Sequence, residues 1–279
     1  MSRKANSMTK CLLVLVSLLL CSALPGPADA ASTATTDRAL LSLFCAPKAI
    51  AGSTCKDARS YPAEQGRCDV TLQPGRQQGR FLAAGNPLLL VSYGSGCEPH
   101  VTNFGGVAVF EKAGRAYKFL GFQPGVDVSE CVIGARVGAQ DVLVCLTGWM
   151  GQGVIESSVA RIVFDSGSDG SFNLSYDVLL QAEDTTSAYL TNFVRCSEQL
   201  KYFDLSKLAV GPSPGTVVAG VSYADRETIE TACGKGFPKP NKDAEDMREP
   251  AAGEGSVPKD YAKTGSVVID IASRAARLR

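Results

Sequence analysis

The clearest pattern in this sequence is a series of short apolar runs separated by turn residues. The runs are rich in Val, Ile, Leu, Phe and Tyr, and several alternate with polar residues, as strands with one buried face do. Clusters of Gly, Ser, Asp and Lys between them are typical of tight turns. We therefore expect strands at residues 88–93, 105–110, 116–122, 131–137, 141–146, 159–164, 171–180, 200–205, 215–223 and 266–271.

Two segments favour short helices instead. In residues 36–44, Thr36 or Asp37 can cap a helix, and the leucines that follow give it an apolar face. Residues 225–233 contain good helix formers and end before a glycine. The stretch from residue 45 to 87 is rich in cysteine and turn residues, and we predict no regular element there.

The strands of the central region recur at an offset of 54 residues. This offset brings Phe110 onto Phe164 and Gly94 onto Gly148, and it repeats the order of strand, Gly-rich loop, strand, tight turn and strand. The pattern predicts a mainly β fold of antiparallel β-meander units with one or two short helices. The units could be arranged as in a propeller or as a sandwich. A full propeller needs at least four blades, for which the chain offers little room.

The first thirty residues predict a signal peptide. A basic start is followed by the apolar run 11–20, and small residues precede a cleavage site at Ala30–Ala31. The apolar run is shorter than the roughly 20 residues that a membrane span needs. We therefore expect a secreted or periplasmic protein without a membrane span after cleavage. Lipidation of Cys21 is an open alternative, although Leu20 stands where a lipobox has a small residue.

The rest of the chain divides by composition. Residues 31–233 predict a disulfide-linked β-rich domain. Residues 234–264 are rich in Pro, Gly and charged residues and poor in aliphatic ones, which predicts a flexible loop or linker. Residues 265–279 predict a terminal strand and a solvated basic tail that contains Arg274 and Arg277.

Cysteine usage points to disulfides. An even number remains after cleavage, and an oxidising compartment keeps such cysteines bridged. Proximity favours pairs among Cys45, Cys55, Cys68 and Cys97. It also favours a bridge between Cys131 and Cys145 across two strands, and one between Cys196 and Cys233. The absence of Cys-x-x-Cys and the single histidine argue against structural zinc and a catalytic thiol. The eight cysteines are Cys45, Cys55, Cys68, Cys97, Cys131, Cys145, Cys196 and Cys233.

Charge and composition exclude some partners. The chain carries 28 basic and 28 acidic side chains, and removal of the signal peptide leaves a net charge of about −2. A near-neutral surface gives no long-range attraction to nucleic acid or anionic membranes, so we expect neither as a partner. The partner expected is a protein, a glycan or a small molecule recognised by local contacts.

Known catalytic and cofactor motifs are missing from the sequence. It has no nucleophile elbow in a strand–turn–helix setting, no phosphate-binding loop and no His-Glu-x-x-His. Residues 165–170 resemble a calcium loop, but Tyr176 stands where the distal acid is needed, so a tight strand turn explains them. We predict no cofactor, no metal and no catalytic residue from motifs.

Two loops carry the candidate ligand-binding residues. If the repeat is real, the loops at 94–103 and 148–153 emerge at the same end of the sheet, where binding residues are often placed. The indole of Trp149 in the second loop can stack on an apolar or sugar face, and polar side chains of both loops can form hydrogen bonds. Alternatively, these are ordinary hairpin loops and the indole covers the core. The residues are Glu98, His100, Asn103, Trp149 and Gln152.

Two classes of function fit these observations. The first is an exported binding or structural module without catalytic activity, which the lack of a catalytic set favours. The second is a glycan-directed hydrolase in which Glu98 and a second acid, Asp141 or Glu156, act as an acid/base pair. Such pairs come from different strands, so sequence spacing cannot reveal them.

Overall fold

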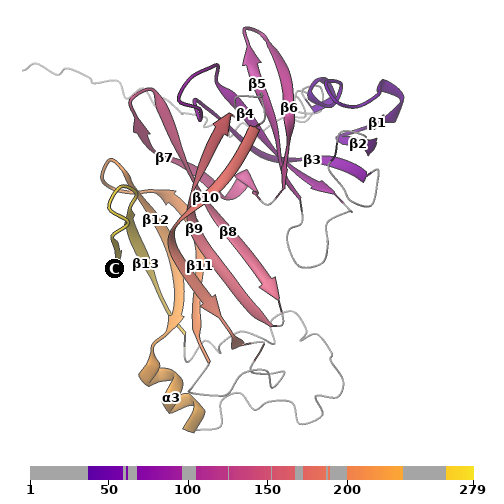
Figure 1. The fold of residues 1–279 in the computed structure, drawn as a ribbon. Coiled ribbons are helices and arrows are strands. Elements are labelled where there is room, and N and C mark those ends of the chain that lie inside the picture. The colour runs from indigo at the N-terminus through magenta and orange to yellow at the C-terminus, as the bar shows by residue number, and fades with distance from the viewer. Residues whose placement is uncertain are drawn as a thin grey trace, which may run out of the picture.

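The computed structural model describes residues 37–58, 61, 68–95, 105–124, 126–151, 153–166, 172–186, 188, 200–234 and 262–279. These residues form two antiparallel sheets, one of six strands and one of eight (Figure 1). Within each sheet, every strand lies beside its neighbour in the sequence. The expectation of a mainly β fold built from antiparallel meanders is therefore confirmed. The predicted signal peptide and Cys21 lie outside the described residues.

The first sheet contains β1 (Ile50–Ala51), β2 (Thr54–Ala58), β3 (Cys68–Gly79), β4 (Leu88–Ser95), β5 (Gly106–Ala113) and β6 (Ala116–Pro124). The second contains β7 (Cys131–Val137), β8 (Gln140–Gly151), β9 (Val154–Ser166), β10 (Phe172–Asp184), β11 (Tyr202–Val210), β12 (Thr216–Ala224), β13 (Lys263–Asp270) and β14 (Ala276–Leu278). Helical segments are residues 37–41, η1 (Pro47–Ala49), η2 (Val128–Glu130) and α3 (Arg226–Gly234). Each predicted strand falls on an observed one, and both predicted helices are present in shortened or shifted form.

Strands β2 and β3 lie where no element was expected. In β3, Cys68, Val70 and Leu72 are buried and alternate with exposed polar residues, which is the pattern of a strand with one solvated face. The pattern breaks at Pro74–Gly75, and the ladder with β4 shifts register there. The strand continues past this irregularity, because a bulge absorbs the residues that cannot pair.

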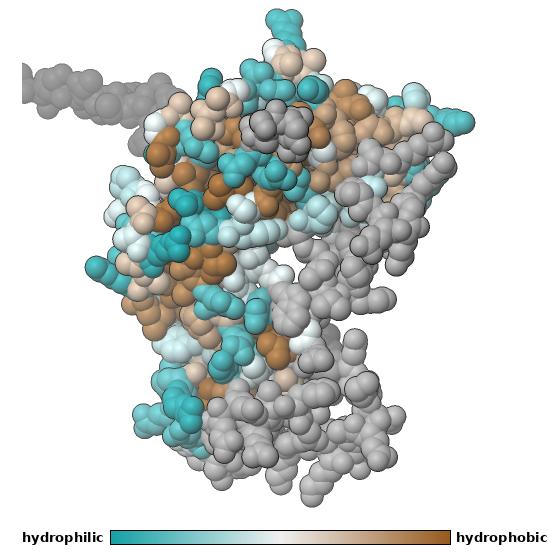
Figure 2. Space-filling view, in the orientation of Figure 1, coloured by the Kyte–Doolittle hydropathy of each residue, from teal (hydrophilic) through white to brown (hydrophobic). Residues whose placement is uncertain are grey.

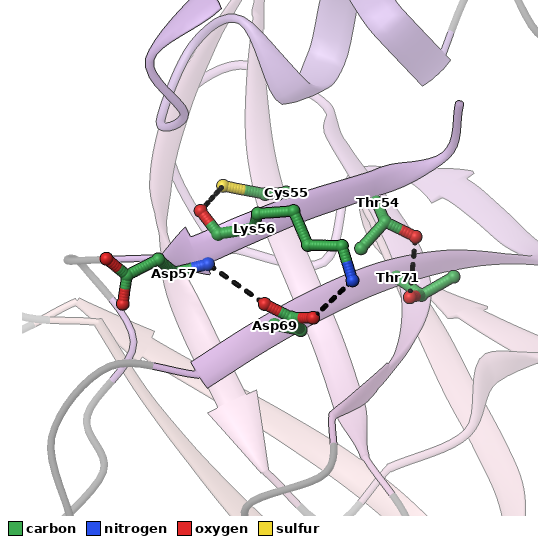
Figure 3. A network of polar contacts seen from close by, with 6 residues as sticks. All are labelled: Thr54, Cys55, Lys56, Asp57, Asp69 and Thr71. Carbon is green, nitrogen blue, oxygen red and sulfur yellow. Dashed lines mark hydrogen bonds and ion pairs between the residues drawn. The ribbon is translucent and has the colours of Figure 1, made fainter. Parts of the chain in front are cut away.

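The hairpin of β2 and β3 is held by exposed polar contacts (Figure 3). Lys56 Nζ lies 2.5 Å from Asp69 Oδ2, and the Asp57 amide donates to Asp69 Oδ1 at 3.0 Å. The hydroxyls of Thr54 and Thr71 lie 2.9 Å apart across the two strands. Lys56 and the Asp57 amide lower the pKa of Asp69. Because these groups are solvated, the network fixes the register of the hairpin more than its stability.

Three apolar clusters form the core. The first lies on one face of the first sheet, where Leu40 and Leu41 of the helical turn cover an aromatic group that includes Phe110 and Phe122. The second lies between the two sheets, with Val107 of β5 and Leu143 of β8 among its buried members. The third lies within the second sheet and joins β8–β10 to β11–β13.

The third cluster exists because the second sheet folds back on itself. Strands β10 and β11 pair at Asp184 and Tyr202 alone. Strands β7–β10 therefore form one layer and β11–β14 a second, and their inner faces pack together. The layers are close: a Cβ atom on Gly134 of β7 would lie 2.7 Å from side-chain atoms of both Val217 and Ile271. The second sheet is thus a sandwich of two four-stranded layers.

The two sheets are locked together around Asp141. Its Oδ2 accepts the Arg80 amide at 2.8 Å, and its own amide donates to the Arg80 carbonyl at 2.8 Å. Its Oδ1 accepts Arg136 Nε at 2.8 Å. The neighbouring Gln140 side chain donates to the Phe81 carbonyl at 2.8 Å. Burial by itself would raise the pKa of Asp141, but the Arg80 amide and the Arg136 guanidinium outweigh burial and lower it.

Two disulfides have the expected partners. Cys45 bridges to Cys55, and Cys131 of β7 bridges to Cys145, its direct partner in β8. Cys68 is also disulfide-bonded. The predicted bridge between Cys196 and Cys233, and any bridge of Cys97, fall outside the described positions or side chains.

The offset of 54 residues carries β4, β5 and β6 onto β8, β9 and β10 in the same order. The pairing differs, however. Leu89 pairs with Phe110 in the first sheet, whereas the corresponding Leu143 pairs with Ile162 and not with Phe164. The two sets of strands also belong to different sheets. The internal repeat stays a prediction.

The C-terminal tail is exposed and also adds a strand to the second sheet. Residues 276–278 form β14, in which Arg277 pairs with Val268 of β13. Arg274 Nη2 lies 2.6 Å from Asp177 Oδ1 on β10. The apolar Leu278 and the backbone of the tail complete the edge of the sheet, which a count of basic residues could not indicate. Most of the predicted linker, residues 235–261, lies outside the described ranges.

Candidate functional site

Four of the five predicted ligand residues, Glu98, His100, Asn103 and Gln152, lie outside the described residues. The fifth, Trp149, belongs to β8 and pairs with Glu156 of β9; only its backbone is described. The expected loop at residues 148–153 is wrong, because β8 continues to Gly151 and its ladder with β9 is unbroken. Gly148 fits in the strand without strain, and the positive φ of Gly153 (77°) makes the tight turn.

The most unusual feature of the described chain is the open edge of β10. One edge of this strand pairs with β9 from Phe172 to Asp184. Along the other edge, Asp184 alone has a partner among the described strands. Unpaired backbone groups along a long strand can hydrogen-bond to an added strand, and proteins usually cover or interrupt such edges. A bulge near Leu179 divides this edge in two but leaves residues 172–178 regular.

An apolar row runs along β10 beside this edge. Phe172, Leu174, Tyr176 and Val178 alternate along one face of the strand. The first two pack against the cluster between the sheets, where the rings of Phe172 and Phe164 are 5.6 Å apart. Tyr176 and Val178 are 43% and 45% exposed. Apolar surface is visible between polar patches in the middle of the molecule (Figure 2). The row is therefore covered at one end and open at the other.

A cavity of about 540 Å³ lies at the far end of the same strand, where β10, β11 and the start of α3 meet. Its walls combine apolar and aromatic surface with charged groups at the rim. Such a combination is typical of sites that bury part of a ligand and orient the rest through polar contacts. The lining residues are Gln181, Ala182, Glu183, Leu200, Lys201, Tyr202, Phe203, Ala224, Arg226 and Ile229.

Each cationic side chain at the rim of the cavity forms an ion pair with a nearby glutamate. Lys201 Nζ lies 2.7 Å from Glu183 Oε2, and Arg226 Nε lies 2.6 Å from Glu230 Oε1 one turn along α3. More than half of each cationic side chain is exposed. Ion pairs of this kind contribute little stability, so both cations can exchange their partner for a ligand at small cost.

The first turn of α3 is fixed beside the cavity. Asp225 accepts the Thr228 amide at 2.8 Å as an N-terminal cap, and it pairs with Lys263 of β13. The hydrogen bond from Lys263 and those from Thr228 lower the pKa of Asp225. This arrangement holds Arg226 at the rim of the cavity.

The proposed acid/base pair stays a prediction, because each form of it needs Glu98, whereas the structure describes the surroundings of Asp141 and Glu156. Asp141 lies at the junction of the sheets with hydrogen bonds to both of its oxygens, and its lowered pKa is the reverse of what a general acid needs. Glu156 Oε2 accepts a hydrogen bond from Gln181 at 3.3 Å near the cavity. Their proposed partner Glu98 is outside the described ranges.

Among the described residues, no group of three or more His, Cys, Asp or Glu side chains is placed to hold a metal ion. No helix in the same part of the chain is long and apolar enough to span a membrane.

Comparison with known proteins gives no assignment. No family model matches the chain, and no curated protein or solved structure matches it.

Proposed function

We propose that this protein is an exported, non-catalytic binding module that takes up an extended segment of another protein along β10. The single observation that carries the proposal is the open edge of β10, with Tyr176 and Val178 exposed beside it. An added strand would hydrogen-bond to the backbone of β10, which gives affinity. Its alternate side chains would contact the apolar row, which gives specificity.

The cavity extends this mode of binding. It begins at residues 181–183 of β10, beyond the bulge, so a segment that follows the edge reaches it directly. A polar or charged residue at the end of the segment would meet Lys201 and Arg226. The near-neutral charge of the chain favours recognition by such local contacts over long-range attraction.

Introducing a charge on the apolar row will test this mode of binding. Peptides of about ten residues with alternating apolar and polar positions would be selected from a display library on the mature protein. We expect Val178→Lys to weaken binding of the selected peptide at least roughly tenfold, because a charged side chain on an edge disfavours strand addition. Calorimetry on both proteins measures the change.

Val137→Lys is the matched control, because Val137 is 68% exposed at the end of another edge strand, β7. This control should bind the peptide as the wild type does. Equal binding by Val178→Lys and the wild type would contradict the proposal. So would amide NMR shifts that follow peptide addition elsewhere than on β10.

Export is supported by the pattern of residues 1–30 and by the disulfides, which persist in oxidising compartments. We predict that the protein recovered outside the cytoplasm begins at Ala31 and carries no thiol that reacts with an alkylating reagent before reduction. Intact-mass spectrometry checks both statements. A mass that includes residues 1–30, or an alkylated thiol, would contradict this part of the proposal.

A further inference from the structure

Two carboxylates lie beside the one described ladder pair between β10 and β11. Asp184 ends β10 and pairs with Tyr202, and Asp204 lies two residues further along β11. Side chains two residues apart on a strand share a face, so both carboxylates lie on the same side of the junction. Asp184 is only 8% exposed. Burial, and to a smaller extent the charge of Asp204, raise the pKa of Asp184.

Each carboxylate is fixed by one oxygen. Asp184 Oδ1 accepts the Thr186 amide at 2.8 Å. Asp204 Oδ1 accepts the Leu205 amide at 2.9 Å and a longer hydrogen bond from the Ser157 hydroxyl at 3.3 Å. Among the described residues, neither carboxylate forms an ion pair with a lysine or arginine. Two like charges, one buried and one half-buried, thus lie near each other without a described cation, which is costly for the folded state.

A third oxygen at this site is the hydroxyl of Thr186. Thr186 is fully buried, and among the described residues its hydroxyl has no partner that meets the distance and angle of a hydrogen bond. The hydroxyl is nevertheless near enough to the Asp184 carboxylate to favour the charged form of that group. A buried hydroxyl without a partner destabilises the folded state, so such an atom marks a place where a ligand or water is expected.

We propose that Asp184, Asp204 and Thr186 bind one calcium ion at the junction of β10 and β11. All three supply hard oxygen atoms, which favour calcium or magnesium over zinc. An irregular set of oxygens from two strands and a turn suits the flexible coordination of calcium better than the strict octahedron of magnesium. The remaining positions would be filled by water and by the Ser157 hydroxyl.

The ion has a structural consequence for the second sheet. Asp184 and Tyr202 form the one described pair between the two layers, and a divalent cation there neutralises both carboxylates. Two carboxylates are few for a calcium site, so we expect a Kd of about 10⁻⁴ to 10⁻³ M, as in extracellular modules. Calcium binding would stiffen the junction of β10 and β11, which lies beside the cavity.

Thermal unfolding of the mature protein tests the site directly. Calcium at about ten times its Kd should raise Tm by roughly 4 °C relative to EGTA. Sodium chloride at the same ionic strength should leave Tm unchanged, and magnesium should act more weakly. Calorimetric titration should show one site per chain. No calcium heat, no shift in Tm, or an equal shift with sodium chloride would overturn the proposal.

Asp204→Asn keeps the shape of the side chain and an acceptor for the Leu205 amide. We expect this variant to lose the response to calcium and to have a higher Tm than the wild type in EGTA, because the repulsion is removed. Thr186→Val should weaken calcium binding several-fold. Asp165→Asn, at an exposed position on β9, is the control for loss of one negative charge and should keep the full response. A full calcium response in Asp204→Asn would overturn the proposal.

Discussion

Replacing Asp141 with alanine will lower the free energy of unfolding by about 2–3 kcal/mol. The change leaves the Arg80 amide without its acceptor at the junction between the sheets; this hydrogen bond is part-buried, and an unsatisfied donor costs up to about 1–3 kcal/mol when it is buried. Loss of the ion pair adds less, because the Arg136 side chain is 69% exposed and returns to water. Urea unfolding of the wild type and the variant measures the difference.

Asp69→Ala is the matched control for this prediction. Asp69 also accepts a backbone amide and pairs with a cationic side chain, but it lies on the exposed hairpin of β2 and β3. We expect a change in unfolding free energy within about 0.5 kcal/mol. Equal losses from Asp69→Ala and Asp141→Ala would show that the junction has no special role.

The contribution of Asp141 will also depend on pH. Its pKa in the folded protein is below its usual value of 3.8, so the folded state binds fewer protons in this range than the unfolded state does. The stabilisation is present above the unfolded pKa and is lost as the pH falls through the folded pKa. The difference between wild type and Asp141→Ala should thus be constant near pH 7 and shrink below about pH 4.

Removing the disulfide between Cys131 and Cys145 will lower the free energy of unfolding by about 3 kcal/mol. The bridge spans 14 residues, and closing a loop of this length restricts the unfolded chain by that amount. Both cysteines are buried in the cluster between the sheets, so a paired alanine substitution avoids placing hydroxyls in apolar surroundings. Denaturation at matched conditions measures the loss.

The bridge between Cys131 and Cys145 matters most for the attachment of β7. This strand pairs with β8 on one side only, and the bridge fixes its first residue next to η2, where the chain passes between the sheets. Hydrogen exchange of the β7 amides should therefore accelerate in the double variant. Wild type reduced with dithiothreitol also loses the bridge between Cys45 and Cys55, so it should unfold at a lower denaturant concentration than the variant does. An unchanged midpoint in the variant would show that the ladder alone holds β7.

Local patterns in the sequence predicted most strands, because an apolar or alternating run reports burial directly. They failed at β3, whose outward-facing side chains are polar and whose pattern is interrupted by Pro74–Gly75. They also ended the predicted strand at residues 141–146 too early. Gly148 resembles a loop residue, but the ladder between β8 and β9 continues through it. The residue pattern indicates which segments form strands, whereas pairing with the neighbouring strand decides where each strand ends.

The open edge of β10 could not be predicted in the same way. Alternation of Phe172, Leu174, Tyr176 and Val178 is visible in the sequence and indicates an ordinary half-buried strand. That the second pair is exposed depends on how far the first sheet reaches over β10. That this edge has no described partner strand before Asp184 depends on the divergence of β11 after one pair. Both are properties of distant packing.

The bridge between Cys131 and Cys145 was predictable because two short strands separated by a tight turn bring their ends together. The Asp184–Asp204 pair was not, since its members lie on strands separated by residues 185–201 and nothing local relates them. Sites of this kind become visible only when the register across the junction is known.

The neighbour-to-neighbour strand order has a consequence for how the chain acquires its structure. Every described ladder joins consecutive strands, and the two described bridges span 10 and 14 residues. Contacts close in sequence lose little entropy on closing and form early. As the chain emerges from a ribosome or a translocation channel, amino end first, most hairpins need no segment still to come. The order of synthesis can thus serve as the order of assembly.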